Sequence, residues 1–484
     1  MTWDHIKKSN EIIMTNRRDF IKIAGLGSLN GGFLGCSSNE KLATYVLDKI
    51  RQSTLKPHKQ SFNMCGYTAP AIETVRIAYI GTGNRGTGAI QRIAHIAGVE
   101  VKALCDVRPE KVEGAKKVVE GVFSPDVYTG KEDWKKVCER DDVDLVYICT
   151  HWDLHAPIAL YAMEHGKHVA VEIPAAQTVE ECWQLVKTSE RTKKHCMMLE
   201  NCCYDFFEML TLNMARQGFF GDIIHVEGAY IHDGFNSLFD KKARWELWRL
   251  KANRRTGSLY PTHGIGPVCQ VLNVNRGDKL EYLVSLSSND FSFGPKLKEL
   301  AATDPDFIPF LNDSFRGNMN TTSIRTAKGR SMMIQHDYSS PRIYSRLHMI
   351  SGTKAMAQKY PLPGKITVGN EKWANDDEMK KIEAQYTPEL VRRIGEMAQK
   401  VGGHGGMDFL MDWRLIDCLR NGLPLDQDVY DAALWSVIIP LSIWSVANKS
   451  APIDIPDFTC GKWTVNKPFD LTLNGGGTTK MIST

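Results

Sequence analysis

The sequence lacks the features that mark zinc proteins, membrane-spanning chains and nucleic-acid-binding proteins. Its 12 cysteines form no Cys-x-x-Cys pair and no His-Glu-x-x-His run is present, so we expect no metal site. We interpret the adjacent Cys202 and Cys203 as buried apolar residues. No apolar run reaches about 18 residues, the length that spans a bilayer. The 60 basic and 56 acidic residues are spread along the chain, which argues against a nucleic-acid partner.

The amino terminus carries a twin-arginine export pattern. In "NRRDFIKIAGLGSLNGGFLGCSS", Arg17 and Arg18 precede a weakly apolar, glycine-rich stretch that ends at Cys36, a candidate lipid-attachment cysteine. An amphipathic helix is the alternative, but each glycine would cost it up to about 1 kcal/mol. Met14 would begin a more typical signal of this kind. We therefore expect a protein exported by the twin-arginine route, either periplasmic or lipid-anchored to the cell envelope.

A glycine-rich turn follows the first predicted strand. The stretch "TVRIAYIGTGNRGTGAIQRIAHI" runs from the apolar residues Val75–Ile80 into Gly81, Gly83 and Gly86, and then into a helical pattern. Such glycines permit a tight turn and let backbone N–H groups approach a pyrophosphate at a helix N-terminus. The next strand, "VEVKALCDV", ends in Asp106, whose carboxylate can accept the ribose 2′-hydroxyl and would repel a 2′-phosphate. The pattern predicts a dinucleotide-binding domain that prefers NAD(H) to NADP(H).

Strands and helices continue to alternate after this turn. The strands "VDLVYICT" and "KHVAVEIP" flank the helical "HAPIALYAMEHG", which predicts a doubly wound parallel sheet. Ligands of such sheets lie at the carboxyl ends of the strands, where we place "GTGNRG", "THWDLH" and "VEIPAA". Glu172 ends one strand, and a carboxylate is seldom buried there without a partner. Trp152 and His155 either contact the cofactor or pack beneath it.

The second half of the chain is rich in polar residues that a core does not need. In "YPTHGIGP", Tyr260 and His263 lie three residues apart in a loop that a proline and a glycine make rigid. In "AYIHD", Tyr230 and His232 project from the same face of a strand. Glu200 ends the apolar "CMML" run at another predicted strand end. Each histidine alone could be structural, but the cluster beside a nicotinamide loop indicates an active site.

The strand-end motifs resemble those of the Gfo/Idh/MocA oxidoreductases. That family usually carries Glu-Lys-Pro, where this sequence has Glu172-Ile173-Pro174; isoleucine cannot transfer a proton, which argues against ordinary dehydrogenation. "MMLENCCY", "GAYIHD", "WRLKANRRTGSLYPTHGIGP", "QHDYSSPRIYSR" with "SGTKA", and "GGHGGMDF" resemble glycoside hydrolase family 109 over roughly residues 75–456. The resemblance implies an α-N-acetylgalactosaminidase that uses tightly held NAD.

The resemblance also implies roles for individual residues. For NAD it implies contacts that add to those of Gly81, Gly83 and Gly86 in the nucleotide loop: Asn84, Arg85, Asp106, Trp152, Asp153, Leu154, His155, Glu172, Ile173 and Asn201. For the sugar it implies Tyr230, Arg249, Tyr260, Pro261, Thr262, His263 and Tyr344. For the chemistry it implies Glu200, Tyr230, His232 and His263.

Length and composition divide the chain into two domains with flanking segments. The 484 residues are 43% hydrophobic, enough for a substantial core. We predict an α/β protein, with an N-terminal Rossmann domain and a C-terminal α+β domain built on a large, open, mostly antiparallel sheet. Related folds use that sheet as a dimer face, so a homo-oligomer is an expectation. The segments are 1–36 (signal), 37–72 (linker), 73–195 (NAD-binding domain), 196–456 (substrate domain) and 457–484 (tail).

The nucleotide loop bears on the mechanism. Direct displacement at the anomeric carbon needs two carboxyl groups and no nucleotide. The hypothesis is instead a transient oxidation at C3, loss of the C2 proton, elimination of the C1 oxygen, addition of water and return of the hydride to C3. We expect His263 near the C3 hydroxyl and Tyr230 or His232 near C2, with Glu200 orienting one of them or acting itself. Arg249 and Tyr344 are expected to bind the sugar, because arginine cannot cycle a proton.

Two other functions are compatible with these residues. A net NAD-dependent sugar dehydrogenase would accumulate NADH, whereas the hydrolase returns its nicotinamide to the starting state. A sugar-binding or cofactor-sensing protein would bind without turnover. The export signal favours the hydrolase, because no NAD pool is expected beyond the inner membrane. An enzyme that regenerates its own NAD⁺ needs one retained molecule, which could be loaded before export of the folded protein.

Overall fold

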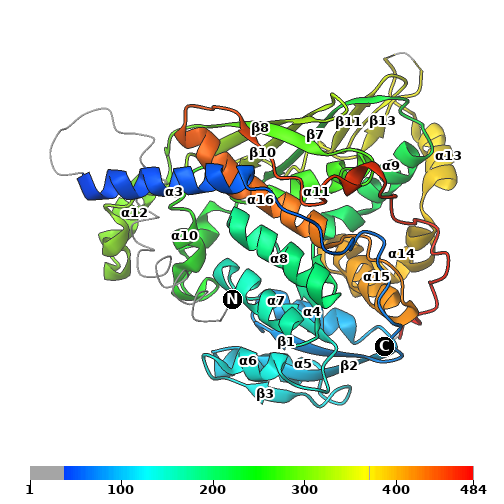
Figure 1. The fold of residues 1–484 in the computed structure, drawn as a ribbon, viewed down its shortest axis with the longest axis horizontal. Helices are drawn as coiled ribbons and strands as arrows, with labels where there is room; N and C mark the ends of the chain where they lie inside the picture. Colours follow the sequence, from blue (N-terminus) through cyan, green and yellow to red (C-terminus); the bar gives the residue numbers. More distant parts are fainter. Residues whose placement is uncertain (1–36, 370, 483–484) are drawn as a thin grey trace.

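The computed structural model describes residues 37–369 and 371–482, and within them two β-sheets lie at opposite ends of the molecule (Figure 1). Helices fill the space between the sheets. The predicted signal, with Arg17, Arg18 and Cys36, lies outside the described residues.

The first sheet is the predicted doubly wound sheet, and its six strands are all parallel. Its order is β3-β2-β1-β4-β5-β6, so the strand order reverses between β1 and β4 and the loops that follow these two strands meet at one edge. The strands are β1 (Val75–Ile80), β2 (Val99–Cys105), β3 (Asp126–Tyr128), β4 (Leu145–Ile148), β5 (His168–Val171) and β6 (Cys196–Met198). The helices of this half are α4 (Asn84–Ile93), α5 (Pro109–Val118), α6 (Asp133–Cys138), α7 (His155–Glu164) and α8 (Val179–Thr192).

The second sheet has eight strands and confirms the predicted large, mostly antiparallel sheet. Its order is β13-β12-β11-β7-β10-β9-β8-β14, and β7 and β10 are its parallel pair. That pairing sets Tyr230 beside His336. The strands are β7 (Ile223–Ile231), β8 (Leu280–Ser287), β9 (Met319–Thr326), β10 (Ser331–Asp337), β11 (Met349–Gly352), β12 (Met356–Gln358), β13 (Lys365–Ile366) and β14 (Ile453–Asp454).

Two helices of the second half, Thr262–Val271 and Val429–Ala447, pack against this sheet, and others pack on them or reach the first half. The helices of the second half are α9 (Phe206–Arg216), α10 (Trp248–Ala252), α11 (Thr262–Val271), α12 (Phe293–Ala301), α13 (Asp376–Tyr386), α14 (Glu389–Val401), α15 (Met407–Asn421) and α16 (Val429–Ala447). Helix α16 packs against α8 and β6 of the first half and against β8 of the second. Among the described residues it is the one helix long and apolar enough to cross a membrane, and 94% of that apolar stretch is buried inside the protein.

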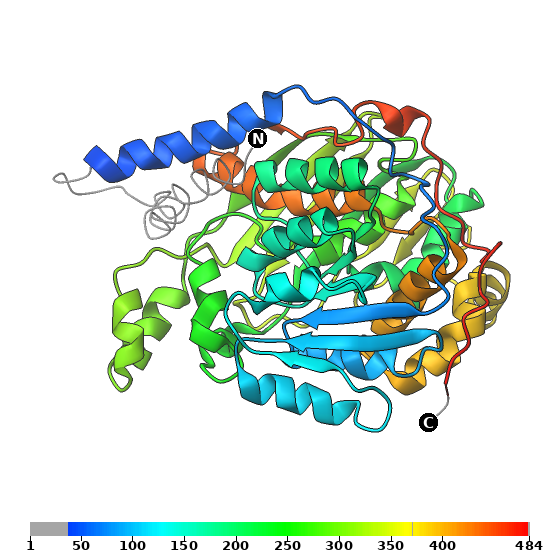
Figure 2. The same cartoon turned by 60° about the horizontal axis from the view of Figure 1, so that its bottom comes forward.

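The predicted linker, 37–72, contains a helix and packs on the body of the protein. It begins with α3 (Ser37–Leu55), which runs along the outside of the molecule (Figure 2). Ile50 is buried, and Ser53 donates a hydrogen bond to Glu180 at 2.7 Å. Farther on, the backbone N–H of Met64 donates to the hydroxyl of Tyr430 at 3.1 Å. The segment therefore packs on the body through contacts that local sequence periodicity does not reveal.

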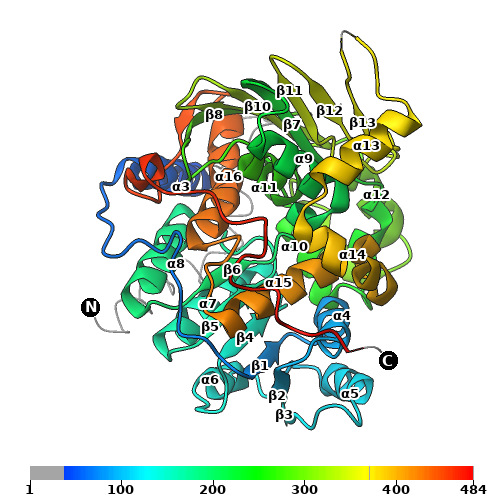
Figure 3. The same ribbon diagram turned by 90° about the vertical axis from the view of Figure 1, so that its right-hand side faces the viewer.

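The predicted C-terminal tail, 457–484, also packs on the body as far as it is described. It runs along α15 and back to the end of α4 (Figure 3). The N–H of Ala97 donates to the carbonyl of Lys480 at 2.9 Å, and the N–H of Ile482 donates to the carbonyl of His95 at 2.8 Å. The last described residues of the tail thus bind to the nucleotide-binding half.

Candidate active site

The nucleotide loop has the geometry that a dinucleotide needs. Helix α4 begins at Asn84, and its N-cap, Gly83, supplies no side-chain hydrogen bond, so the N–H groups of the first turn can bind an anion. A Cβ on Gly86 would lie 2.0 Å from the carbonyl oxygen of Gly81. Glycine at 86 is therefore what lets the helix pack directly on the turn. These features fit the pyrophosphate of NAD.

Asp106 lies at the end of the second strand, as predicted. Its carboxylate accepts a hydrogen bond from the N–H of Thr82 at 2.9 Å and pairs with Arg108 at 3.2 Å. The Arg108 guanidinium stacks on Trp245, with 5.6 Å between guanidinium carbon and ring centroid. Asp106 is thus held beside the glycine turn, where the ribose hydroxyls of a dinucleotide lie.

Arg85 and Glu172, both predicted NAD contacts, bind each other across the edge of the sheet. Arg85 Nε lies 2.7 Å from Glu172 Oε1 at the end of β5, and Arg85 Nη1 lies 2.8 Å from Asp408 Oδ2 on α15. Asn201, at the start of the short 3₁₀ helix η3 (Asn201–Tyr204), also donates a hydrogen bond to Asp408. Two predicted cofactor residues, Arg85 and Asn201, therefore bind one carboxylate that the sequence analysis did not assign, and Arg85 links that carboxylate to Glu172.

Asp408 is almost fully buried, with 1% of its side chain exposed. Burial alone would raise its pKa, but the hydrogen bond from His404 and the charges of Arg85 and Arg92 hold that pKa well below its ordinary value. The signal in the sequence was the motif "GGHGGMDF", which contains Asp408 and was read only as part of the family resemblance.

Within the predicted segment Trp152 to His155, Trp152 and His155 have different roles. Trp152, Asp153 and Leu154 form the 3₁₀ helix η2 (Trp152–Leu154), and the Trp152 ring lies 5.8 Å from that of Tyr260. His155 is buried, and its two ring nitrogens lie 2.8 Å and 3.0 Å from the carbonyl oxygens of Pro174 and Thr150. Its side chain therefore anchors the loops, while Trp152 connects the nucleotide edge to the second domain. Ile173 is buried next to this edge.

Rings from two elements gather beside this edge. The ring centroids of Tyr230, Tyr260 and His263 lie 4.9 Å to 5.0 Å apart in all three pairs. The segment "YPTHGIGP" was expected to be a rigid loop, but helix α11 already begins at Thr262. The reason is packing: α11 crosses β7 so closely that a Cβ on Gly264 would lie 2.5 Å from the backbone nitrogen of Ala229. Pro261 is the N-cap of that helix.

His263 is oriented by Glu200. Glu200 Oε1 lies 2.7 Å from His263 Nδ1 and Glu200 is fully buried. Burial would raise the pKa of Glu200, but the charge and hydrogen bond of His263 hold it below its ordinary value. Cys202 Sγ also lies 3.1 Å from His263 Nδ1. Ligand atoms of Glu200, Cys202 and His263 are close enough to hold a metal, but in this arrangement Glu200 and His263 bond each other directly.

His232 follows β7 and lies on the same side as Tyr230, as the strand alternation predicted. The two rings are stacked with centroids 6.0 Å apart. His232 Nδ1 is a buried atom without a hydrogen-bond partner among the described residues, and burial lowers the pKa of this imidazole. Burial raises the pKa of the Tyr230 hydroxyl to about 12. At neutral pH His232 is therefore a neutral base and Tyr230 a protonated hydroxyl.

Arg249 and Tyr344, predicted to bind the sugar, border the same group of rings. The Arg249 guanidinium lies over Trp152 and Tyr260, at 5.5 Å and 5.0 Å from their centroids. The Tyr344 ring lies 5.5 Å from that of His232, and its hydroxyl accepts a hydrogen bond from Arg346 at 3.1 Å. The structure thus brings all predicted sugar and catalytic residues together.

Two further rings were missed. Tyr338 lies 5.4 Å from His232 and 5.8 Å from Tyr230, and His336 lies 6.4 Å from Tyr230. Both follow from the strand alternation in "QHDYSS", but only after β10 is known to pair with β7. Arg346, held by Asp205 and Glu208 at 2.7 Å each, was also missed, because these partners lie about 140 residues away in the sequence.

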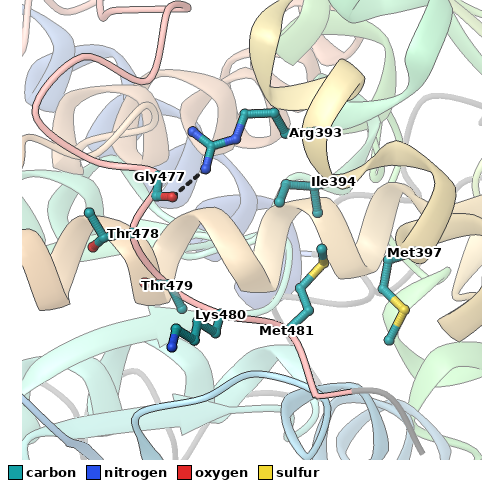
Figure 4. Close-up of a pocket in the computed structure, with 8 residues that line it drawn as sticks. All are labelled: Arg393, Ile394, Met397, Gly477, Thr478, Thr479, Lys480 and Met481. Carbon is teal, nitrogen blue, oxygen red and sulfur yellow. Dashed lines mark hydrogen bonds between the residues drawn. The ribbon is translucent and has the colours of Figure 1, made fainter.

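A separate groove lies away from this site. It has a volume of 460 Å³ and lies between α14 and the C-terminal tail (Figure 4). Arg393 donates a hydrogen bond across it to the carbonyl of Gly477 at 2.6 Å. Its lining, from Arg393 and Met397 to Met481, includes no predicted site residue.

Comparison with known proteins identifies both halves. The family profile "Oxidoreductase family, NAD-binding Rossmann fold" matches residues 75–200, and "Glycosyl hydrolase 109, C-terminal domain" matches residues 204–465. An alpha-N-acetylgalactosaminidase of Bacteroides fragilis is 50% identical over 412 residues, covering 83% of this chain and 96% of that protein. A glycosyl hydrolase family 109 protein of Bacteroides thetaiotaomicron is 47% identical over 415 residues, covering 81% of this chain and 86% of that protein.

Solved structures show the same fold at low identity. Levoglucosan dehydrogenase in complex with NADH superposes with a TM-score of 0.59 at 18% identity, covering 79% of this chain and 100% of that one. Scyllo-inositol dehydrogenase from Lactobacillus casei, with bound NAD(H) and scyllo-inositol, superposes with a TM-score of 0.56 at 16% identity, covering 79% and 99%.

Proposed function

The chain belongs to glycoside hydrolase family 109, and from that membership we propose that it hydrolyses α-linked N-acetylgalactosamine with the help of a tightly held NAD. The observation that carries the proposal is the cluster of Tyr230, Tyr260 and His263, whose rings lie within 5.0 Å of one another. Trp152 joins this cluster to the nucleotide edge. Ordinary glycosidases place two carboxyl groups on either side of the scissile bond. This cluster consists of tyrosine and histidine rings instead.

The residues that would hold NAD are those of the first half. The first turn of α4 would bind the pyrophosphate and Asp106 the adenosine ribose. When bound, the nicotinamide supplies a reversible acceptor for the hydride of the sugar C3 carbon. The remaining chemistry consists of proton transfers, which fall to side chains of the second half.

We assign the proton transfer at the C3 hydroxyl to His263. Its Nδ1 bonds the buried Glu200, which fixes the ring orientation and leaves Nε2 as the basic atom toward the substrate. Because the pKa of Glu200 is held low, this carboxylate stays ionised and stabilises the imidazolium that forms. Glu200 is therefore a positioning residue and His263 the catalytic one.

His232 and Tyr230 share the steps at C2 and C1. Neutral His232, with its unpartnered Nδ1, accepts the C2 proton after C3 has become a ketone. Tyr230, protonated at neutral pH, donates a hydrogen bond to a developing negative charge. Arg249 and Tyr344 bind the hydroxyls or the acetamido carbonyl, since neither cycles a proton at neutral pH.

The lowered pKa of His232 predicts the acid limb of the pH profile. Its base form is present above that pKa and is lost as pH falls through it. We therefore expect protonation of His232 to lower kcat/KM only below pH about 6.5, the ordinary value for histidine. His232→Gln should lower kcat/KM by about 10²- to 10⁴-fold and change the shape of the acid limb, leaving the part that the His263 base contributes. The measurement is kcat/KM against pH, with His225→Gln at the other end of β7 as the control. Wild-type kcat/KM in His232→Gln, or an acid limb identical to that of the wild type, would contradict the assignment.

The decisive experiment follows sugar release in deuterated water. The purified protein is incubated with an aryl α-N-acetylgalactosaminide, and we expect free sugar that carries solvent deuterium at C2, with no net NADH. Deuterium enters because a C2 proton removed to a solvent-exchanging base returns from solvent. Release with C2 unlabelled would overturn the elimination route. NADH that accumulates with turnover would instead support a net sugar dehydrogenase, and binding without turnover a sugar-binding protein.

Export in the folded state with NAD already bound is also part of the proposal. The twin-arginine pattern at Arg17 and Arg18 supports it, and Cys36 is the candidate lipid-attachment residue. A tightly held dinucleotide suits a compartment without its own NAD pool. A homo-oligomer through the eight-stranded sheet stays a prediction, which the mass of the purified protein in solution would test.

A further inference from the structure

The loop between α14 and α15 carries one side chain in a row of glycines. It reads Gly402-Gly403-His404-Gly405-Gly406, and all five residues have positive φ, His404 included at 48°. A Cβ on Gly403 would lie 2.7 Å from the Cβ of Asp408 and 3.0 Å from Arg92 Cδ. The glycines therefore let the loop lie tightly against the nucleotide-binding half. His404 carries the one side chain of this loop that can bind a ligand.

Helix α15 is joined to α4 beside this loop. Arg92 Nε lies 2.7 Å from Asp412 Oδ2, and both residues are buried. Arg85, in the nucleotide loop itself, lies 2.8 Å from Asp408. The end of the Gly402–Gly406 loop is thereby fixed next to the first turn of α4, as the neighbouring positions of α4, α14 and α15 show (Figure 3).

Arg85 does not supply free positive charge to a pyrophosphate. Its guanidinium lies between the carboxylates of Glu172 at 2.7 Å and Asp408 at 2.8 Å. Arg85 therefore links the two halves, because Glu172 belongs to the first half and Asp408 to the second. An anion at the first turn of α4 would receive backbone N–H groups from one side, and a cationic group on the other side would have to come from another residue.

His404 lies beside Arg85, which belongs to the first turn of α4. Its Nδ1 is 2.9 Å from Asp408 Oδ2 and 3.4 Å from Arg85 Nη1, while 60% of its side chain is exposed. With Nδ1–H donating to Asp408, Nε2 is the ring atom that can bond a ligand. An imidazole that carries both protons donates from both nitrogens, here to the carboxylate on one side and to a phosphate on the other.

We propose that the Gly402–Gly406 loop is a clasp on the bound dinucleotide, in which His404, oriented by Asp408, donates a hydrogen bond from Nε2 to the pyrophosphate. The clasp rests on the proposed function, because it explains how NAD would be retained. It lies outside the sugar site, so it contributes to holding the dinucleotide and not to the proton transfers at C2 and C3.

The test is the rate at which NAD leaves the purified protein. His404→Asn keeps a donor for Asp408 and suits a left-handed backbone, but it removes Nε2. We expect it to release NAD at least about tenfold faster than the wild type, a loss of one charge-assisted hydrogen bond. His404→Gly is expected to do the same without strain. His165→Asn, an exposed histidine at the end of α7, is the matched control and should release NAD at the wild-type rate.

Thermal unfolding of the NAD-free protein distinguishes binding of NAD by His404 from a purely structural role of this residue. The clasp predicts that His404→Asn leaves that melting temperature unchanged and lowers only the one measured with NAD. Wild-type release rates in both His404 variants would overturn the proposal, as would fast release that occurs only in Asp408→Asn. A wild-type protein that binds no NAD would overturn the proposed function as well, whereas a protein that retains NAD but cleaves no glycoside would leave the clasp standing.

Discussion

Replacing His263 by asparagine is expected to lower kcat/KM by about a thousandfold while NAD stays bound. Asparagine keeps an N–H donor for Glu200 at the position of Nδ1 and removes Nε2, the atom assigned to the C3 hydroxyl. General acid–base groups contribute about 10²- to 10⁴-fold to the rate. A thousandfold loss with NAD still bound would therefore be a loss of proton transfer and not of cofactor. The measurement combines steady-state kinetics on an aryl α-N-acetylgalactosaminide with the NAD content of the same preparation.

Glu200→Gln tests the role of the carboxylate behind the ring. Glutamine can still accept a hydrogen bond from Nδ1 but cannot stabilise the imidazolium, so we expect activity between the wild type and His263→Asn. The double variant should be no worse than His263→Asn alone, because the two residues act as a unit. Additive losses would show that Glu200 acts independently on the substrate, and unchanged activity in His263→Asn would reassign the C3 proton to another residue. His225→Asn serves as the matched control on β7.

The first half of the chain was predictable because its signals are local. Continuous apolar runs with glycines at their ends placed β1, β2, β4 and β5, and the carboxylates Asp106 and Glu172 at strand ends marked the ligand edge. Strand β3 was missed because its three residues lie at the sheet edge, where Asp126 and Val127 are exposed. A strand without buried side chains leaves no hydrophobic pattern to read.

In the second half, several residues of the candidate site could be predicted from the sequence, but the pairing of its strands could not. Tyr230 and His232 follow from strand alternation, and the sugar residues from the family resemblance. Tyr338 and His336 join them only because β10 pairs in parallel with β7, a contact between segments about a hundred residues apart. Asp408 could not be assigned from sequence for the same reason: its partners Arg85 and Asn201 lie more than two hundred residues away. Long-range pairing is decided by the whole fold and not by any local window.

Replacing Gly86 by alanine is expected to abolish NAD binding and, with it, activity. The added Cβ would lie 2.0 Å from the carbonyl oxygen of Gly81 and 3.1 Å from its carbonyl carbon, and both are backbone atoms that cannot rotate away. Helix α4 must therefore move off the turn, which displaces the N–H groups that would bind the pyrophosphate. The measurements are the NAD content of the purified protein and its affinity for added NAD, which we expect to fall at least about a hundredfold, or roughly 3 kcal/mol.

Gly88→Ala is the matched control, because it makes the same substitution two residues further along the same helix. A Cβ there meets only Arg92 Nη1 at 3.5 Å, an ordinary contact, and alanine favours a helix over glycine by up to about 1 kcal/mol. We expect this variant to keep its NAD and to melt at the same or a higher temperature. Gly86→Ala should melt lower even without NAD, since overpacking costs about 1–3 kcal/mol. If Gly86→Ala retained NAD as Gly88→Ala does, the dinucleotide would have to bind away from the first turn of α4, and the proposed cofactor site would be wrong.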